Sequence, residues 1–402
     1  MIGLYPGASP EHGVADYTRS LAMALQESGM EVAVWADRSH GAIATEESDG
    51  DLNVCRVWRP GALVGIDLWS RARRNLPRLV HVQFESFIYG GPLGFLSLWV
   101  FLLWVRLVGG KVVVTVHHVA APADLTTRLL RQSGIRVGPR LARAIFRLST
   151  GLLARAAHAL IVHEDVFRER LTTHYRLGHP LVEVVPHGVP LPECEESPRE
   201  TGDGGRVVLL FGYLKWYKGF DLALRAFRQV ADEFPEWRLV IAGGLPASAA
   251  ASHVRYVDDL RRLGEGLDGR VEFTGYVPTA QLPRRLRRAD LMLFPYRILF
   301  SASGPLAQAI GWRRPFILSR ALQPVLPQWP WICSEDVEAW AAMLRLLMSD
   351  EQARMDASHQ LRDIAAARGW REAARRTIAL YERVVGAPVV LNRPLPSSWV
   401  GS

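Results

Sequence analysis

Lysine is almost absent from this chain of 402 residues. Only Lys111, Lys215 and Lys218 are lysines, and the remaining 45 of the 48 basic residues are arginines. The imbalance indicates a GC-rich coding bias, so the net charge of +8 does not by itself predict a nucleic-acid partner, and we expect none. Against this background, Lys215 and Lys218 predict a tight anion site, because Lys is a compact point charge whereas Arg is a wide fork.

Cysteines, low-complexity segments and short repeats are also scarce. Cys55, Cys194 and Cys333 are odd in number and far apart, which excludes a disulfide framework and a zinc-finger spacing and favours a reducing cytoplasm. The lack of repeats and low-complexity segments excludes a solenoid and a disordered scaffold. The chain opens on a strand-like run, with no pattern typical of a signal peptide.

Long apolar runs are limited to one segment, PLGFLSLWVFLLWV at 92–105, which Arg106 follows. It is shorter than the roughly 20 residues that a bilayer-spanning helix needs. We interpret it as a buried helix beneath a sheet. A helix at a membrane interface and a true span stay as alternatives, so peripheral contact with the inner face of the cell membrane is an open hypothesis for an otherwise cytoplasmic protein.

The first half of the chain alternates strand-like and helix-like runs. The strand-like runs are Met1–Tyr5, Glu31–Ala36, Leu79–Gln83, Lys111–His117, Ala159–His163 and Val182–Val185. Between the first two, Val14, Tyr17, Leu21 and Leu25 recur at helical spacing, and Gly29 predicts the end of that helix. Apolar strands joined by helices predict a parallel sheet with right-handed crossovers.

A second α/β unit follows a polar segment rich in Pro, Gly and Glu between Pro190 and Arg206. Its predicted elements are strands Val207–Phe211, Arg238–Ala242, Arg270–Thr274, Asp290–Phe294 and Pro315–Ser319 and helices Phe220–Phe234 and Arg371–Val385. The length suits two domains of roughly 200 residues. We therefore expect two doubly wound, Rossmann-like domains (1–190 and 206–369) with a ligand between them, and a separate terminal helix at 370–386.

Three βα turns carry the candidate chemistry. In the first, Gly13 precedes a helix, where an anion can approach the backbone closely; a purely structural glycine is the alternative. In the second, His117 and His118 end a strand at the edge where ligands bind in parallel sheets, although a histidine capping a loop would look the same.

The third and strongest candidate is an anion site between two segments of the second unit. Gly212 ends a strand, and Lys215 and Lys218 lie in the loop before the next helix, whose dipole favours an anion. In SGPL, Ser303 suits an N-cap, Gly304 allows close approach and Pro305 suits the first turn. The helix from Leu306 would then present free N–H groups to a diphosphate.

In this order the segments resemble the family-4 retaining glycosyltransferases of GT-B fold. The resemblance covers nearly the whole chain, through HGVADYTRSLAMAL, VVVTVHH, VVPHGV, FGYLKWYKGFDLALRAF, RLVIAGG, VEFTGYVP and SGPLAQAI. It implies a nucleotide-sugar donor on the second domain, a hydroxyl acceptor on the first, transfer with retention, and a last helix that crosses back to the first domain.

The resemblance also assigns residue roles. It places His117 at the sugar or acceptor pocket and Lys218, supported by Lys215, at the diphosphate. The other candidate donor contacts are Gly13, Gly212, Tyr213, Tyr276, Val277, Ser303, Gly304, Pro305, Leu306 and Gln308. The candidate acceptor contacts are Asp16, Tyr17, Glu85 and His118.

Two departures from the family pattern affect the expected chemistry. Tyr213 stands where the family usually has an arginine, and Phe300 and Gln308 stand where it has two glutamates. We expect no metal and no cofactor, because no D-x-D run lies near the predicted site. A nucleotide-sugar epimerase and a catalytically impaired nucleotide-sugar-binding protein remain alternatives to a transferase.

The arginines near one face of a predicted helix, Arg140, Arg143 and Arg147, fit either an anionic membrane or a solvated surface. For an arginine-rich chain the sequence alone favours the solvated surface.

Overall fold

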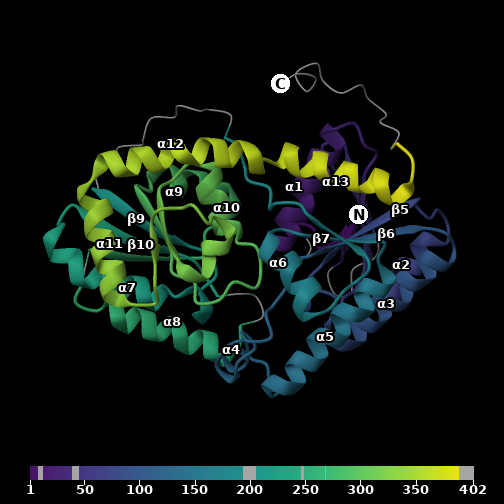
Figure 1. Ribbon diagram of the computed structural model, residues 1–402, viewed down its shortest axis with the longest axis horizontal. Helices are drawn as coiled ribbons and strands as arrows, with labels where there is room; N and C mark the ends of the chain where they lie inside the picture. The colour runs from purple at the N-terminus through teal and green to yellow at the C-terminus, as the bar shows by residue number, and fades with distance from the viewer. Residues whose placement is uncertain (8–11, 39–44, 193–204, 246–248, 268, 389–402) are drawn as a thin grey trace.

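Two lobes lie side by side, each around its own sheet, with the last two helices running along one edge of both (Figure 1). The computed structural model describes residues 1–7, 12–38, 45–192, 205–245, 249–267 and 269–388. Most of the predicted linker at 190–206 and the last residues, 389–402, therefore lie outside the described residues.

The first lobe contains an eight-stranded sheet in the order β3-β4-β2-β1-β5-β6-β7-β8. All its neighbouring strands are parallel except the antiparallel pair β3 and β4. The strands are β1 Ile2–Gly3, β2 Ala33–Asp37, β3 Thr45–Asp49, β4 Leu52–Trp58, β5 Leu79–Phe84, β6 Lys111–Val116, β7 Ala159–Val162 and β8 Leu181–Val184. The α-helices are α1 Gly13–Glu27, α2 Val64–Ala72, α3 Gly91–Leu107, α4 Thr127–Gln132, α5 Pro139–Ala156 and α6 Asp165–Glu169.

The second lobe contains a wholly parallel six-stranded sheet in the order β11-β10-β9-β12-β13-β14. Its strands are β9 Arg206–Phe211, β10 Trp237–Ala242, β11 Val271–Gly275, β12 Leu291–Phe294, β13 Phe316–Ser319 and β14 Ile332–Cys333. Its α-helices are α7 Phe220–Val230, α8 Ala251–Gly264, α9 Leu282–Arg288, α10 Gly304–Gly311, α11 Val337–Ser349 and α12 Glu351–Arg368. The central strands are buried throughout, as a doubly wound sheet requires.

The predicted fold class and all eleven predicted strands are confirmed to within a few residues. The helix predicted over Phe220–Phe234 is shorter, because α7 ends at Val230 and a 3₁₀ turn continues to Glu233. Strands β3, β4 and β14 were not predicted. Gly29 follows α1 with φ of +87°, the left-handed conformation that a terminating glycine supplies.

The last helix, α13 Trp370–Val385, returns to the first lobe and packs against α1. Its Ala373, Ala374, Leu380 and Tyr381 join a buried cluster with Tyr17 and Leu21 of α1. Arg368, at the end of α12, donates to both carboxylate oxygens of Glu164 in the first lobe, at 2.8 and 3.0 Å. The two lobes are therefore joined along this edge by apolar packing and by a largely buried ion pair.

Helix α3, the apolar run of the sequence, lies at the surface and not beneath the sheet. One face contributes Leu98, Leu102 and Val105 to the core, but Leu93, Leu96, Val100 and Leu107 are exposed on the other. The expectation of a buried helix beneath the sheet holds for one face of α3 only, because α3 covers the sheet as an outer layer and nothing from the described chain packs over its exposed stripe. None of the helices in the described ranges is long and apolar enough to cross a membrane.

Candidate functional site

The turn after β9 brings Lys218 against the start of α10. A 3₁₀ turn, Trp216–Lys218, leads into Gly219, whose φ of +70° allows α7 to begin directly. A Cβ atom at Gly212 would lie 2.6 Å from the Lys218 Nζ and 3.0 Å from the Pro305 Cγ. The ammonium group, the end of β9 and the first turn of α10 therefore meet, as expected for a phosphate site.

Lys218 is buried in this turn and Lys215 is half-buried. Lys218 is only 7% exposed, and burial, reinforced by the charge of Lys215, lowers its pKa from 10.5 to about 7. Burial also lowers the pKa of Lys215, while Glu85 acts in the opposite direction. Within the described chain neither ammonium group has an ion pair or a hydrogen bond. A buried cation without an ion pair, as Lys218 is, is costly for the fold and well suited to an anionic ligand.

The start of α10 is capped more completely than predicted. The Ser303 Oγ accepts a hydrogen bond from the Leu306 N–H at 3.2 Å and also contacts the Tyr296 hydroxyl at 2.9 Å. The expectation that Leu306 presents a free N–H group is therefore wrong. Gly304 is the first-turn amide that has no partner in the described chain, and a Cβ at Gly304 would meet nothing within 4 Å. The first turn of α10 therefore keeps one amide without a partner in the described chain, and not several.

The first lobe faces the lysines with Glu85 and two histidines. The Glu85 carboxylate lies 3.7 Å from the His12 Nε2 and 3.6 Å from the His118 Nε2, and its charge reaches Lys215. Burial lowers the pKa of His118. The sequence predicted Glu85 and His118 but missed His12, whose Nδ1 caps α1 by accepting from the Val14 N–H at 3.2 Å. Its only signal in the sequence was a hydrogen-bonding residue directly before Gly13.

His117 points into the first lobe, away from this group. Its Nε2 lies 3.0 Å from the Gln83 Oε1 and its Nδ1 lies 3.3 Å from the His163 Nε2. Because both ring nitrogens are engaged and the residue is 7% exposed, His117 does not present a free nitrogen to a ligand in this structure. His117 follows β6 directly and its N–H still donates to the Phe84 carbonyl at 2.9 Å, so successive side chains of this extended segment point to opposite faces and His118 takes the other side.

Tyr17 lies behind His117, in the aromatic layer between α1 and α13. Its ring lies 4.8 to 5.2 Å from the rings of His117, His163, His187 and Trp370. It is 2% exposed, so the predicted contact between Tyr17 and an acceptor is not available. Asp16, the other candidate on this helix, is exposed in its first turn, and Gly13 is exposed at its start.

Two tyrosines lie together at the carboxyl ends of β9 and β11 in the second sheet. The rings of Tyr213 and Tyr276 are 6.5 Å apart and tilted by 24°. Tyr276 is 44% exposed, whereas Val277 is buried. Gln308 lies half-buried on α10. The structure thus brings the candidate donor contacts of the second lobe to the ends of β9, β11 and β12, around one edge of the sheet.

Phe300 lies at the contact between the lobes. Its carbonyl accepts from the Val119 N–H at 2.7 Å, and the next residue, Ser301, forms a β-bridge with His118. Its ring packs against Tyr217 at 4.7 Å and against His118 at 5.2 Å. Where the resembling family has a carboxylate, this chain therefore has an aromatic ring that joins the two lobes beside the lysines.

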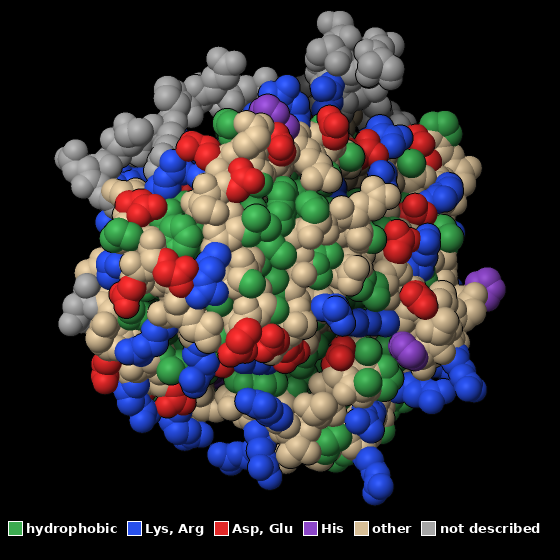
Figure 2. All heavy atoms as spheres, turned by 60° about the vertical axis from the view of Figure 1, so that its left-hand side comes forward, with side chains coloured by type: hydrophobic (Ala, Val, Ile, Leu, Met, Phe, Trp, Pro, Cys, Tyr) green, Lys and Arg blue, Asp and Glu red, His purple; other side chains and the backbone are tan. Residues whose placement is uncertain are grey.

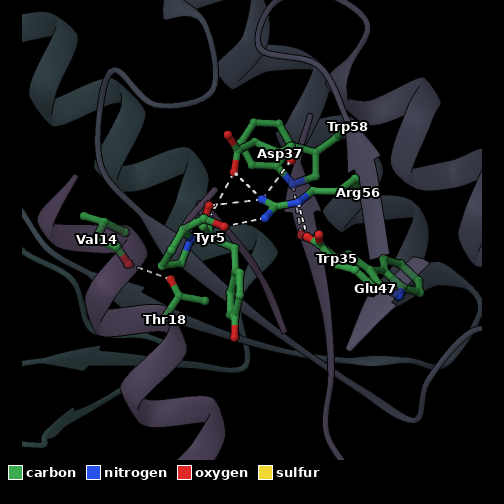
Figure 3. A network of polar contacts seen from close by, with 9 residues as sticks. Tyr5, Val14, Thr18, Trp35, Asp37, Glu47, Arg56 and Trp58 are labelled. Atoms are coloured by element: carbon green, nitrogen blue, oxygen red, sulfur yellow. Dashed lines mark hydrogen bonds and ion pairs between the residues drawn. The ribbon is translucent and has the colours of Figure 1, made fainter. Parts of the chain in front are cut away.

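The chain just after β1 is held by a buried cation that the sequence did not reveal. Arg56 of β4 donates to the Tyr5 carbonyl at 3.0 Å and to the Pro6 carbonyl, and Asp37 accepts from the Tyr5 N–H at 3.0 Å (Figure 3). Arg56 is 7% exposed. These contacts hold the end of β1 against β2 and β4 and so set the direction in which the chain leaves the sheet towards α1.

Two family models match the chain in succession. "Glycosyltransferase Family 4" matches residues 12–193 and "Glycosyl transferases group 1" matches residues 205–350. Among curated proteins, a D-inositol 3-phosphate glycosyltransferase of Corynebacterium kroppenstedtii is 25% identical over 65% of this chain. The alignment spans 61% of that relative. The Arthrobacter protein of the same name is 27% identical, over 94% of this chain and 92% of the relative.

Solved structures share the two-lobed architecture. Sucrose-phosphate synthase from Thermosynechococcus elongatus superposes with a TM-score of 0.73 and 16% identity, over 96% of this chain and 98% of that one. The Anabaena protein HepE, solved in complex with UDP and glucose, superposes with a TM-score of 0.67 and 15% identity, over 95% and 98%. At these identities the likeness establishes the fold.

Proposed function

This chain belongs to the family-4 type of glycosyltransferases with a GT-B fold, and from that premise we propose that it transfers a hexosyl unit from a nucleotide-diphosphate sugar to a hydroxyl acceptor. The observation that carries the proposal is the buried ammonium group of Lys218, which has no ion pair within the described chain and lies beside Gly212 and the start of α10, with the half-buried Lys215 close by. Such a position suits a diphosphate, whose charge would compensate both cations.

The chemical problem is to expel a nucleoside diphosphate from the anomeric carbon of the sugar. Negative charge grows on the departing oxygen, and a preorganised cation and amide dipole directed there lower the barrier most. We assign Lys218, Lys215 and the Gly304 N–H to this task. The departing phosphate accepts the proton of the acceptor hydroxyl, which attacks from the same face, so the anomeric configuration is retained without a carboxylate nucleophile.

The sugar end of the donor has fewer polar partners than the phosphate end. Phe300 cannot hydrogen-bond a sugar hydroxyl, whereas Gln308 can act as a neutral partner for a ribose or sugar hydroxyl. We propose that Glu85, His118 and His12 contact the acceptor side. Polysaccharide, lipid-linked glycan and small natural product all remain open as acceptors.

The first experiment separates donor binding from transfer. A thermal-shift screen with UDP-, GDP-, dTDP- and ADP-sugars identifies the donor, because a ligand that binds only the folded state raises the melting temperature. The purified protein is then incubated with that donor, with and without candidate acceptors. Acceptor-dependent product supports transfer. Conversion of the donor alone would indicate an epimerase, and tight binding without turnover would indicate a non-catalytic binding protein, which the Phe300 substitution makes a specific alternative.

Metal independence is part of the proposal. The D-x-D run in the sequence, Asp49-Gly50-Asp51, lies in the β3–β4 hairpin. The Asp49 carboxylate there accepts hydrogen bonds from Arg19 and from the Tyr5 hydroxyl. The lysines and the α10 amide supply the positive charge that a divalent cation would otherwise bring to the diphosphate. Transfer should continue at its full rate in a strong chelator, and a loss that Mg²⁺ or Mn²⁺ restores would overturn this part.

A further inference from the structure

The surface formed by α2, α3 and α5 combines exposed apolar side chains with unpaired arginines. Among the described residues, twelve of the nineteen large hydrophobic side chains that are exposed fall between Leu63 and Leu148. They are Leu63, Ile66, Trp69, Phe87, Leu93, Leu96, Val100, Leu107, Val108, Leu141, Ile145 and Leu148. A concentration of this kind is unusual for a free surface and marks an interaction site.

The helices α2, α3 and α5 lie side by side (Figure 1), so the exposed side chains on their outer faces belong to one surface. The Ser97 Oγ of α3 accepts from the Gly65 N–H of α2 at 3.0 Å, and a Cβ at Gly65 would lie 2.2 Å from the Ser97 carbonyl oxygen. On the other side, the Trp99 indole of α3 donates to the Leu152 carbonyl of α5 at 2.8 Å. Leu93, Leu96, Val100 and Leu107 follow one another at helical spacing along α3.

The net positive charge of the chain is concentrated in the segment that contains α3 and α5. Residues 86–163, which contain α3 and α5, include nine basic residues and a single acidic one, Asp124. This excess of eight equals the net charge of the whole chain, so the remaining residues are balanced. In Figure 2, Lys and Arg side chains gather along the lower edge of the molecule, on the side where Figure 1 places α4, α5 and α8.

On α5 the arginines flank the apolar stripe. Leu141, Ile145 and Leu148 are exposed along one line, and Arg140 and Arg147 are exposed beside it. Neither arginine has an ion pair or a hydrogen bond within the described chain, and α3 and α5 contain no carboxylate. A stripe of leucine and isoleucine beside free guanidinium groups fits the boundary between acyl chains and anionic headgroups.

We propose that the face formed by α2, α3 and α5 docks this protein on an anionic lipid bilayer. The exposed stripe of α3 offers no hydrogen-bonding side chain with which a protein partner would pair, whereas its aliphatic side chains can enter a bilayer interface directly. Trp69 of α2 adds an amphipathic ring, which is the kind of side chain that favours the membrane–water interface. The proposal concerns a surface outside the lysine site and does not depend on the chemistry assigned there.

Docking on this face would bring the site close to the membrane. Ala142 and Phe146 of α5 belong to the apolar cluster that also contains Tyr217 and Phe300, which lie beside the lysines. An acceptor anchored in the same bilayer would therefore have a short path to the contact between the lobes.

The test is co-sedimentation of the full chain with vesicles of phosphatidylcholine alone or mixed with phosphatidylglycerol. We expect binding to the mixed vesicles only, weakening with salt. Because each arginine near an anionic surface contributes about fivefold to partitioning, the double substitution Arg140→Gln with Arg147→Gln should weaken binding by about 25-fold. The matched control, Arg225→Gln with Arg362→Gln, removes two exposed arginines from the second lobe and should leave binding unchanged.

A second pair of variants tests the apolar stripe. Leu148→Glu should abolish sedimentation with mixed vesicles, whereas Met355→Glu, at an exposed position of α12, should not. Equal binding by the wild type and both α5 variants, or no binding to mixed vesicles at all, would overturn the proposal. So would a dimer in analytical ultracentrifugation that the α5 variants convert to monomer, because the face would then be an interface between two copies.

Discussion

Lys218 should have opposite effects on the stability of the free protein and on the binding of an anion. Burial disfavours the charged ammonium group, yet only the charged form attracts a diphosphate. Replacement by alanine should therefore lower turnover by about 10²–10³, the loss found when one preorganised charge-stabilising donor is removed. Lys111→Ala provides the control, because Lys111 lies at the start of β6 and should leave turnover unchanged. If the steady-state rate of Lys218→Ala lies within a few fold of the wild-type rate, the assignment of Lys218 to the phosphate site is wrong.

The same side chain should couple nucleotide binding to proton uptake. With a pKa of about 7 in the free protein, Lys218 is mostly neutral at about pH 8, and a bound diphosphate would raise its pKa and draw in a proton. Affinity for the nucleoside diphosphate should therefore fall as the pH rises above about 7, by at most about tenfold per pH unit.

Titration calorimetry in buffers of different ionisation enthalpy measures this uptake directly. At about pH 8 we expect nearly one proton per nucleotide bound, and at about pH 6 much less. In Lys218→Ala, the number of protons taken up per nucleotide should be the same at the two pH values. Binding of the wild type without proton uptake at the higher pH would show that another group supplies the charge.

At the residue scale, the two loop lysines could be predicted as an anion site because their rarity is itself a signal, and the structure places Lys218 beside the start of α10. The sequence could not separate His117 from His118, because the alternation of β6 says that they point to opposite faces but not which face meets the second lobe. His12 and Arg56 were missed for a related reason. Their partners, Glu85 and the end of β1, come close only after the sheet has formed.

At the scale of elements, we expect the cap of α10 to link stability to ligand binding. Ser303→Ala would leave the Leu306 N–H without its partner and the Tyr296 hydroxyl without its contact. We expect a loss of about 1 kcal/mol in the free energy of unfolding together with weaker nucleotide binding, because Gly304 and Pro305 lie in the same turn.

Asp336→Ala is the matched control for this change. The Asp336 carboxylate caps α11 by accepting from the Ala339 N–H at 3.2 Å. Asp336→Ala should lower the free energy of unfolding by a similar amount in chemical denaturation, while the affinity for the nucleotide stays unchanged. If both variants bind nucleotide equally well, the α10 turn does not contact the ligand.

Strands were predictable where both faces are buried. Apolar runs such as β9 and β12 show directly in the sequence, since a central parallel strand needs hydrophobic side chains on both sides. β3 could not be found in this way, because its sequence, TEESD, is almost fully exposed and its pairing is antiparallel at the sheet edge. The partner strand β4, and not the intrinsic preference of these residues, makes it a strand.

At the scale of the whole molecule, the sequence indicated two α/β units because the pattern of strands and helices restarts after the linker. It gave no information on how the lobes meet. That contact depends on single groups from distant segments, such as the Val119 amide with Phe300, and Arg170, which donates to the Leu299 and Val119 carbonyls.

The pair of Glu164 and Arg368 provides a test of how strongly the lobes are coupled. Arg368 also donates to the Val325 carbonyl at 3.0 Å, so Arg368→Ala would remove three hydrogen bonds and leave the Glu164 carboxylate buried alone. We expect a loss of about 3–5 kcal/mol in unfolding free energy and, in calorimetry, separate unfolding of the two lobes where the wild type unfolds in one step. Arg375→Ala, which breaks a pair on the exposed side of α13, should cost less than about 1 kcal/mol.

The pH dependence of this loss distinguishes a buried charge from lost packing. Burial raises the pKa of Glu164, and Arg368 opposes that rise. Without Arg368 the carboxyl group of the folded protein should titrate well above its unfolded value. A raised pKa in the folded state contributes stability at low pH that disappears as the pH rises, so the deficit of Arg368→Ala should be large at about pH 8 and shrink towards about pH 5. A deficit that stays constant over this range would mean that Arg368 stabilises the junction through packing and its bond to Val325, and that the charge of Glu164 has little part in joining the lobes.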